Sequence, residues 1–352
     1  MEDRHSLQTL THYGLCSLAY SSYILDGMYR VADSSDLSVR VKRSVPLEYR
    51  QAAAGHENMQ MMLLFDAVDH DGRRIRFCVD NHDKAHFIHQ DVLSIADLYF
   101  KLNHDPQELD RLGLSRSERD KIHAVKSPIS PLRLNRWTHR PALHKVDEVG
   151  WGPRNMARRV RHLARFSTME EIVALRSTPP SVDVVFIVRI YREAHHQPVN
   201  EIRYEIARRL DKHPDINATV GFLGRTDGKF ARFATPALAT KHHLAQLASS
   251  RVGVYVWGPH RCLSFKMAEL LALGLPVVGL PIQQDRANLA SRKLLAEQFA
   301  YADPGGLVDA VAKALDDDSR LAELRRANTQ LFDTELAPEP TARRILDQVF
   351  GT

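Results

Sequence analysis

The stretch that decides the fold spans residues 252–290 and reads VGVYVWGPHRCLSFKMAELLALGLPVVGLPIQQDRANLA. Its first part, residues 252–257, is apolar and rich in valine, which is typical of a buried strand, and a Gly-Pro pair ends it. Apolar residues at helical spacing follow over residues 264–273, and Gly274 stands where a helix-terminating glycine belongs. Residues 277–280 predict a second buried strand. The pattern therefore indicates a strand–helix–strand crossover of a parallel sheet.

The loop before the predicted helix carries charged residues. His260 and Arg261 stand just before Ser264, the candidate N-cap, where backbone N–H groups and the helix dipole attract an anion. Glu269 lies further along the helix, and its carboxylate can accept hydrogen bonds from a ribose diol. A phosphate at the helix start with a carboxylate nearby is what a nucleotide-sugar site requires. The alternative is an ordinary buried crossover with a solvated glutamate.

Residues 262–279, CLSFKMAELLALGLPVVG, resemble the donor-binding core of nucleotide-sugar glycosyltransferases of the GT-B fold, and of the glycosyltransferase group 1 family among them. In the retaining branch, two glutamates separated by seven residues precede a Gly-Pro-Val-Val ending. Glu269 matches the second glutamate, which holds the ribose, and Ser264 stands where a glycine usually faces the diphosphate. Arg261 departs from the pattern, because it occupies the position of the first glutamate, which contacts the donor sugar.

A second likeness lies in residues 281–290, PIQQDRANLA. Many inverting GT-B enzymes follow this strand with a proline and then with Asp-Gln and Asn-Ala pairs that contact the sugar. Asp285 and Asn288 match this pattern, whereas Arg286 replaces the glutamine. Since each pattern is interrupted, the stereochemistry of transfer stays open.

The resemblance implies an α/β chain of two Rossmann-like domains facing a cleft, which is the GT-B fold. Strands predicted at 182–190 and 216–223 alternate with helices predicted at 200–210 and 235–248, as in a doubly wound parallel sheet. The Thr-Pro-Pro-Ser segment at 178–181 marks a domain boundary. We therefore expect an acceptor-binding domain at 1–178, a nucleotide-sugar-binding domain at 179–337, and a C-terminal helix at 338–352 that crosses back to the first domain.

Arg192 and Arg225 lie just after two of these predicted strands. In the retaining branch, a basic pair near such positions neutralises the departing diphosphate, and this charge stabilisation replaces a metal ion. The resemblance thus implies a nucleotide-diphosphate sugar as donor substrate, with no metal and no cofactor. Surface salt bridges are the alternative interpretation of both arginines.

The N-terminal half offers a second group of candidates. Residues 61–68 and 74–79 predict a hairpin with its turn at 69–72, and a polar loop follows the return strand. Asp80, His82, Asp83 and His86 in this loop are candidates for the base that takes the proton of an acceptor hydroxyl, because ligands of open α/β sheets bind beyond the carboxyl ends of strands. A polar loop with turn-forming aspartates is the alternative, and a metal site there lacks supporting cysteines or a second histidine pair.

Residues 97–101, DLYFK, resemble a stretch in the N-terminal domain of some bacterial glycosyltransferases, where a strand carries a lysine towards the cleft. Lys101 is that lysine, and a solvated strand end is the alternative. A basic segment follows at 133–165, with Arg133 and Arg165 at its ends and aromatic residues between them. It fits a nucleic-acid or acceptor contact, a solvated face with buried aromatics, or a membrane-surface patch.

The length, net charge and cysteine content suit a cytoplasmic globular protein, and a peripheral membrane location is left open. The 352 residues carry a formal net charge of +5 and three scattered cysteines, without zinc-site spacing, a signal peptide or a bilayer-length apolar run. We expect a glycosyltransferase acting on modified DNA, as some phage enzymes of this fold do, or on a cell-envelope glycan or a small molecule. One alternative is a non-catalytic nucleic-acid- or partner-binding protein on a degenerate GT-B scaffold. Another is a nucleotide-sugar epimerase or phosphorylase that shares the fold and differs in its acceptor. The oligomeric state is not readable.

Overall fold

The chain, described here from a computed structural model, forms two compact units. Unit 1 comprises residues 1–168 and 335–352, and unit 2 comprises residues 169–334. The boundaries expected from the sequence lie after residues 178 and 337. The structure describes residues 7–13, 17–42, 45–53, 61–69, 71–133, 161, 164–224, 227–280 and 303–351. Both units combine a sheet with flanking helices, so the expected α/β class is confirmed.

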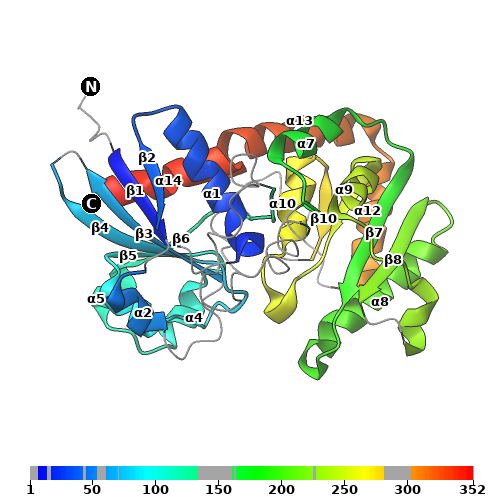
Figure 1. The fold of residues 1–352 in the computed structure, drawn as a ribbon. Coiled ribbons are helices and arrows are strands. Elements are labelled where there is room, and N and C mark those ends of the chain that lie inside the picture. Colours follow the sequence, from blue (N-terminus) through cyan, green and yellow to red (C-terminus); the bar gives the residue numbers. More distant parts are fainter. Residues whose placement is uncertain are drawn as a thin grey trace. The chain divides into compact units, whose positions relative to one another are not determined.

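Unit 1 is built on a mixed six-stranded sheet in the order β2-β1-β3-β4-β5-β6 (Figure 1). Strand β3 runs antiparallel to both of its neighbours, and every other pair is parallel. The strands are β1 (Leu7–Tyr13), β2 (Ser38–Lys42), β3 (Met62–Asp69), β4 (Arg74–Asp80), β5 (Leu98–Lys101) and β6 (Ile122–Ala124). The helices are α1 (Leu18–Asp33), α2 (Leu47–Ala53), α3 (Gln90–Ile95), α4 (Pro106–Asp110), α5 (Arg116–Asp120) and α14 (Pro338–Phe350).

The hairpin expected from the sequence is formed by β3 and β4. The Gly72 N–H donates to the Asp69 carbonyl at 3.2 Å, and the Arg73 N–H donates to the Asp69 carboxylate at 2.8 Å. Gly72 has a φ of 80°, a left-handed value that glycine adopts without steric cost. The turn therefore closes where the Asp-His-Asp-Gly sequence indicated.

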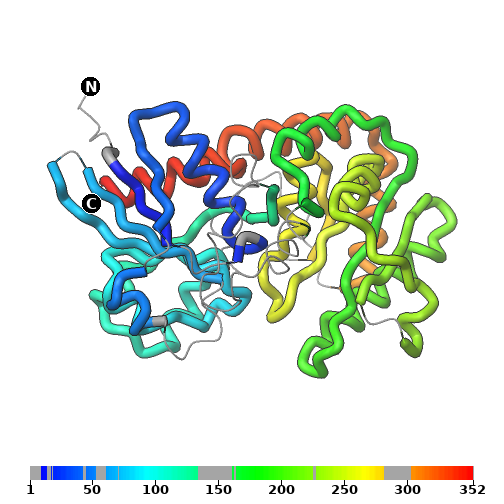
Figure 2. The backbone as a smooth tube through the Cα atoms, in the orientation of Figure 1, coloured from blue at the N-terminus to red at the C-terminus, as the bar shows by residue number. Residues whose placement is uncertain are grey.

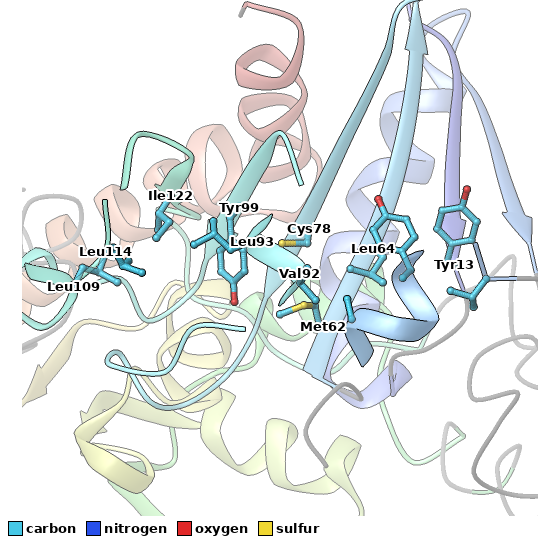
Figure 3. Packing of buried hydrophobic residues seen from close by; sticks show 13 residues of the cluster. Tyr13, Met62, Leu64, Cys78, Val92, Leu93, Tyr99, Leu109, Leu114 and Ile122 are labelled. Atoms are coloured by element: carbon cyan, nitrogen blue, oxygen red, sulfur yellow. The ribbon is translucent and has the colours of Figure 1, made fainter. Parts of the chain in front are cut away.

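The core of unit 1 occupies both faces of this sheet. Figure 3 shows one cluster, in which alternate residues such as Met62 and Leu64 of β3 pack with Val92 and Leu93 of α3. On the other face, Phe65 stacks on Phe77 of β4 with ring centroids 4.7 Å apart. Burial of both faces explains why the β3 sequence is mostly apolar rather than alternating. Each such fully buried side chain stabilises the fold by about 1.5–3 kcal/mol.

Helix α14 belongs to unit 1, where it packs against α1 (Figures 1 and 2). The two segments approach closely at Gly27, because a β-carbon there would lie 2.0 Å from the Pro338 carbonyl oxygen. The Tyr23 hydroxyl donates to the Leu336 carbonyl at 2.6 Å. Residues more than 300 positions apart are thus joined in one unit.

Unit 2 is built on a fully parallel four-stranded sheet in the order β10-β9-β7-β8. Helix α8 contacts α12, and α10 contacts α13 and α7. The strands are β7 (Val182–Ile190), β8 (Ala218–Gly224), β9 (Ser250–Tyr255) and β10 (Val277–Gly279). The helices are α7 (Met169–Ala174), α8 (Gln197–Lys212), α9 (Thr240–Ala248), α10 (Phe265–Ala272), α12 (Pro304–Leu315) and α13 (Asp318–Leu331).

The helix expected at 235–248 begins later than the sequence pattern suggests, and its first five residues are not helical. The Thr235 N–H donates to the Phe222 carbonyl at 3.0 Å, and Ala234 forms a parallel bridge with Phe222. Because this segment completes hydrogen bonds at the end of β8, it cannot also start a helix. None of the helices in the described ranges has the length and apolar character needed to cross a membrane.

Candidate functional site

The carboxyl ends of β7 and β9 form the first candidate region. These two strands are neighbours in the sheet. The chain goes from β7 to β8 on one side of this pair and from β9 to β10 on the opposite side. In open parallel sheets, such a reversal of strand order leaves a crevice beyond the strand ends, where ligands bind. The loops that follow are residues 191–196, which end in the short helix η4 (Ala194–His196), and residues 256–264, which contain η6 (Pro259–Arg261).

Two buried polar residues of α8 hold these loops from below. Asn200 accepts a hydrogen bond from the Tyr191 N–H at 3.0 Å and donates to the Tyr191 carbonyl at 2.9 Å. The Arg203 guanidinium donates to the carbonyls of Arg189 and Trp257, one at the end of β7 and one beyond β9. Asn200 and Arg203 are 0% and 4% exposed. The backbone at this edge is therefore fixed by buried hydrogen bonds, which is how rigid ligand sites are supported.

The loop after β9 is tightly wound and strained. His260 and Arg261 have φ values of 54° and 58°, left-handed conformations that cost side-chain-bearing residues of order 1–3 kcal/mol each. The Gly258 N–H donates to the Cys262 carbonyl at 3.0 Å, and a β-carbon on Gly258 would lie 2.4 Å from the Cys262 sulfur. The Arg261 guanidinium lies over the Trp257 ring, 5.2 Å from its centroid. Such strain is often kept at ligand-binding loops.

Three imidazole rings gather above this edge. The ligand nitrogens of His195, His196 and His260 all lie within 4.8 Å of one another. His196 is buried, whereas His195 and His260 are exposed. Burial, together with the neighbouring His195, lowers the pKa of His196 below its usual value, so its ring is neutral at pH 7. Within the described part of the chain, this is the one group of three histidine, cysteine or acidic side chains with metal-ligand spacing.

Helix α10 follows the strained loop and carries the residue expected to hold a ribose. Glu269 is 9% exposed, and the Lys266 ammonium lies 2.9 Å from its carboxylate. Lys266 also contacts His243 of α9. Burial, followed by the charge of Lys266, lowers the pKa of His243 to about 4. Ser264 occupies the N-cap position, but its side chain does not cap the helix, because its hydroxyl donates to the Val256 carbonyl at 3.3 Å.

The other donor-site candidates are placed only in part. Arg192 is exposed in the loop after β7. Arg225, Asp285 and Asn288 lie outside the described residues, as does nearly all of the basic segment at 133–165. The structure thus brings His260 together with two histidines that the sequence pattern did not single out.

Unit 1 contains a second candidate region, at the ends of β4 and β5. Asp80 and Lys101 are paired residues of these parallel strands, both 0% exposed, with the ammonium 2.8 Å from the carboxylate. The Tyr99 hydroxyl donates to the same carboxylate oxygen at 2.6 Å, and the His82 Nδ1 lies 2.7 Å from the other oxygen. Burial opposes ionisation, but Lys101 and His82 together hold the pKa of the Asp80 carboxyl well below its usual value. Asp80 is therefore an ionised carboxylate.

His82 has the environment of a general base. In a neutral ring whose Nδ1–H donates to the Asp80 carboxylate, Nε2 carries the lone pair that accepts a proton. Nε2 is buried and makes no hydrogen bond within the described residues. The Asn103 amide donates to the His82 carbonyl at 2.9 Å, and the Phe87 ring lies 4.9 Å from the imidazole. This arrangement holds the ring in place beside a carboxylate, as in the histidine–carboxylate pairs that accept protons in hydrolases.

The remaining candidates of this loop differ from His82. Asp83 is half-buried and His86 is exposed. Lys101 is completely buried, so the solvated strand end considered from the sequence is wrong. The contacts of Tyr99 and Lys101 with Asp80 were not predicted from the sequence; they follow from the parallel pairing of β4 with β5.

No protein-family model matches this chain, and no curated protein matches its sequence. Among solved structures, TarM of S. aureus, crystallised with Fondaparinux, alpha-GlcNAc-glycerol and UDP, aligns with a TM-score of 0.42 and 8% identity over 83% of this chain. The alignment covers 64% of the TarM chain, so this chain spans less than two thirds of that protein.

A second solved structure, from Listeria monocytogenes, is described as a UDP-N-acetylglucosamine 2-epimerase. It aligns with a TM-score of 0.41 and 11% identity over 97% of this chain and 95% of its own. Neither likeness assigns an activity to this chain.

Proposed function

We propose that the chain is a GT-B glycosyltransferase of the group 1 type, which moves a sugar from a nucleotide-diphosphate sugar to an acceptor hydroxyl. The observation that carries the proposal is the edge at the reversal point of the unit 2 sheet. There, a strained loop bearing His260 and Arg261 leads into a helix whose buried side carries Glu269. An anion-binding loop and a carboxylate within one turn or two of a helix start suit a diphosphate and a ribose.

The roles in the donor site follow from charge and position. Arg261 and Arg192 are exposed cations beside the strand ends, and they would neutralise the diphosphate as it departs. Glu269 would accept hydrogen bonds from the ribose hydroxyls, and Lys266 lies 2.9 Å from its carboxylate. Arg225, Asp285 and Asn288 complete the proposal as contacts to the phosphates and the sugar.

The acceptor would be activated in unit 1. His82 Nε2 would take the hydroxyl proton as that oxygen attacks the anomeric carbon, and Asp80 would stabilise the imidazolium that forms. Because Nε2 is buried in this conformation, the 81–89 loop must move for a hydroxyl to reach it. Modified DNA and a cell-envelope glycan remain the proposed acceptor classes.

The decisive experiment compares two glutamates that each pair with a cation three residues earlier. Glu269→Gln removes the proposed ribose contact beside Lys266, whereas Glu323→Gln removes an exposed partner of Arg320. Calorimetric titration with the diphosphates of uridine, guanosine, thymidine, adenosine and cytidine identifies the base that binds. Loss of hydrogen bonds to a charged group costs about 1.5–3 kcal/mol, so Glu269→Gln should weaken that nucleotide about 10- to 100-fold. Glu323→Gln should leave the affinity unchanged.

A second candidate function has one observation in its favour. Glu269 already carries an ion pair with Lys266, as it would in a scaffold that has lost its donor. A non-catalytic nucleic-acid- or partner-binding protein would bind none of the five diphosphates and would turn over no nucleotide sugar. Equal nucleotide affinity in Glu269→Gln and the native chain would likewise remove the donor site from α10.

A further inference from the structure

The cluster of His195, His196 and His260 has a chemistry that the proposed sugar transfer does not use. Its three side chains come from two loops, η4 after β7 and η6 after β9, and meet where these adjacent strands end. The His195 and His260 rings are stacked at 5.4 Å between centroids, and the His196 ring lies 3.9 Å from that of His195 and 5.2 Å from that of His260. Three imidazoles therefore share one small volume.

We propose that these three histidines bind one divalent transition-metal ion of the zinc class, with a fourth coordination position left open. Three neutral imidazoles are a known zinc donor set, and the same ligands suit cobalt, nickel and copper. Hard cations such as Mg²⁺ prefer oxygen ligands, which this cluster does not supply. The resemblance to GT-B glycosyltransferases led to the opposite expectation of no metal. No short ligand spacing joins residues 195–196 to residue 260, so the sequence pattern did not indicate the cluster.

The geometry needs only a small adjustment. In a tetrahedral zinc site, bonds of about 2.0–2.1 Å place the ligand nitrogens about 3.3 Å apart. The nitrogens of the cluster lie within 4.8 Å, so closure requires shifts on the order of 1.5 Å. His195 and His260 are exposed at the surface, whereas His196 is buried and acts as the fixed ligand.

The backbone beneath the cluster is already held in place. Asn200 holds the backbone of Tyr191, whose ring centroid lies 4.9 Å from that of the His196 imidazole. Arg203 donates hydrogen bonds both to the Arg189 carbonyl, at the end of β7, and to the Trp257 carbonyl, beyond the end of β9. The left-handed backbone at His260 sets the direction in which its side chain leaves the loop. Ligands carried on a supported backbone lose little freedom on binding, which favours affinity.

The test uses the untagged full-length chain, stripped with a chelator and titrated with Co²⁺ alone. Tetrahedral Co²⁺ absorbs visible light far more strongly than the hydrated ion. The native chain should saturate at one ion per chain, and Zn²⁺ should displace the ion and abolish the absorption. His195→Ala and His260→Ala should each weaken Co²⁺ binding at least about tenfold, since even outer partners of metal ligands contribute that much. Both residues are exposed, so the variants should keep their fold.

His242→Ala is the matched control, because His242 is an exposed histidine outside the cluster, and this variant should bind Co²⁺ as the native chain does. Far-ultraviolet circular dichroism and Tm confirm that each variant is folded. A native chain without a saturable site would overturn the proposal. Native-like affinity in both cluster variants would overturn it too, because the ion would then bind elsewhere among the 18 histidines. No nucleotide is present, so the result is independent of the donor-site experiment.

Discussion

Replacing Lys101 by methionine isolates the buried ion pair of unit 1. Methionine keeps the length and apolar stem of lysine but removes the ammonium that lies 2.8 Å from the Asp80 carboxylate. Both residues are 0% exposed, so water cannot take over the lost interaction. The variant therefore leaves an ionised carboxylate inside the sheet with only its hydrogen bonds to His82 and Tyr99.

The magnitude follows from this environment. Breaking a buried pair by removing one partner typically costs about 3–5 kcal/mol, because an uncompensated charge remains. Since His82 and Tyr99 still bond Asp80, we expect the lower end, about 3 kcal/mol, which corresponds to a fall in Tm of about 6–12 °C for a unit of this size. Lys229→Met removes the exposed ion pair with Glu201 and should cost no more than about 1 kcal/mol.

The pH dependence gives a second, independent readout. The folded-state pKa of Asp80 lies below its unfolded value of about 3.9, so the stabilisation is present above that pH and is lost as the pH falls. Without Lys101, burial raises the pKa of Asp80. On acidification, Asp80 is therefore protonated at a higher pH in the variant than in the native chain, and this protonation removes the unpaired buried charge. The stability difference between the two should therefore shrink as the pH is lowered from 7 towards about 4.

Scanning calorimetry at several pH values measures both effects. Hydrogen exchange of the Leu102 amide, which donates to the Asp80 carbonyl at 2.9 Å, reports the same region locally. In the double variant Asp80→Asn with Lys101→Met, no charge is left to bury, so part of the stability should return. A Tm of Lys101→Met within about 2 °C of the native value at pH 7, or a stability difference that grows on acidification, would refute the reasoning.

Three further predictions concern the site, the fold and the acceptor. His82→Ala should lower kcat for sugar transfer about 10²- to 10⁴-fold with little change in the donor KM, as steady-state kinetics would reveal; an unchanged kcat would exclude it as the base. Gly274→Ala should destabilise unit 2 by more than about 2 kcal/mol, because the φ of Gly274 is 69° and the new methyl group would lie 2.3 Å from the Thr329 hydroxyl. Gly228→Ala is the control, since Gly228 has a φ of 55° but open space around it, and this variant should cost about 1 kcal/mol. Urea unfolding measures both values. If DNA is the acceptor, the logarithm of duplex affinity should fall linearly with the logarithm of salt concentration; absent or salt-insensitive binding would rule it out.

Elements with strong local signals were predictable in detail. The apolar run at 182–190 became β7 with the same bounds, and the segment at 338–350, opened by a proline, became α14. Gly274 ends α10 in the left-handed conformation expected of it. These elements are specified by burial pattern, proline and glycine within a few residues, and that information is local to the sequence.

The features that the sequence pattern did not predict depend on contacts between distant segments. The late start of α9 follows from hydrogen bonds to β8, and the burial of Lys101 follows from the pairing of β4 with β5. His195 and His260 meet only because the sheet order places β7 beside β9. Strand order and side-chain pairing across strands are not encoded in any short window, so the clusters that they create had no sequence signature.

The packing of α14 on α1 bears on how the chain acquires its structure during synthesis. A ribosome makes every residue of unit 2 before it makes residues 335–352, which unit 1 needs. Until then, the Gly27 side of α1 and the Tyr23 hydroxyl have no partner in α14 or in the segment that leads to it. The unit that is begun first is therefore the one that is finished last, and its apolar surface stays open to chaperones and proteases for longer.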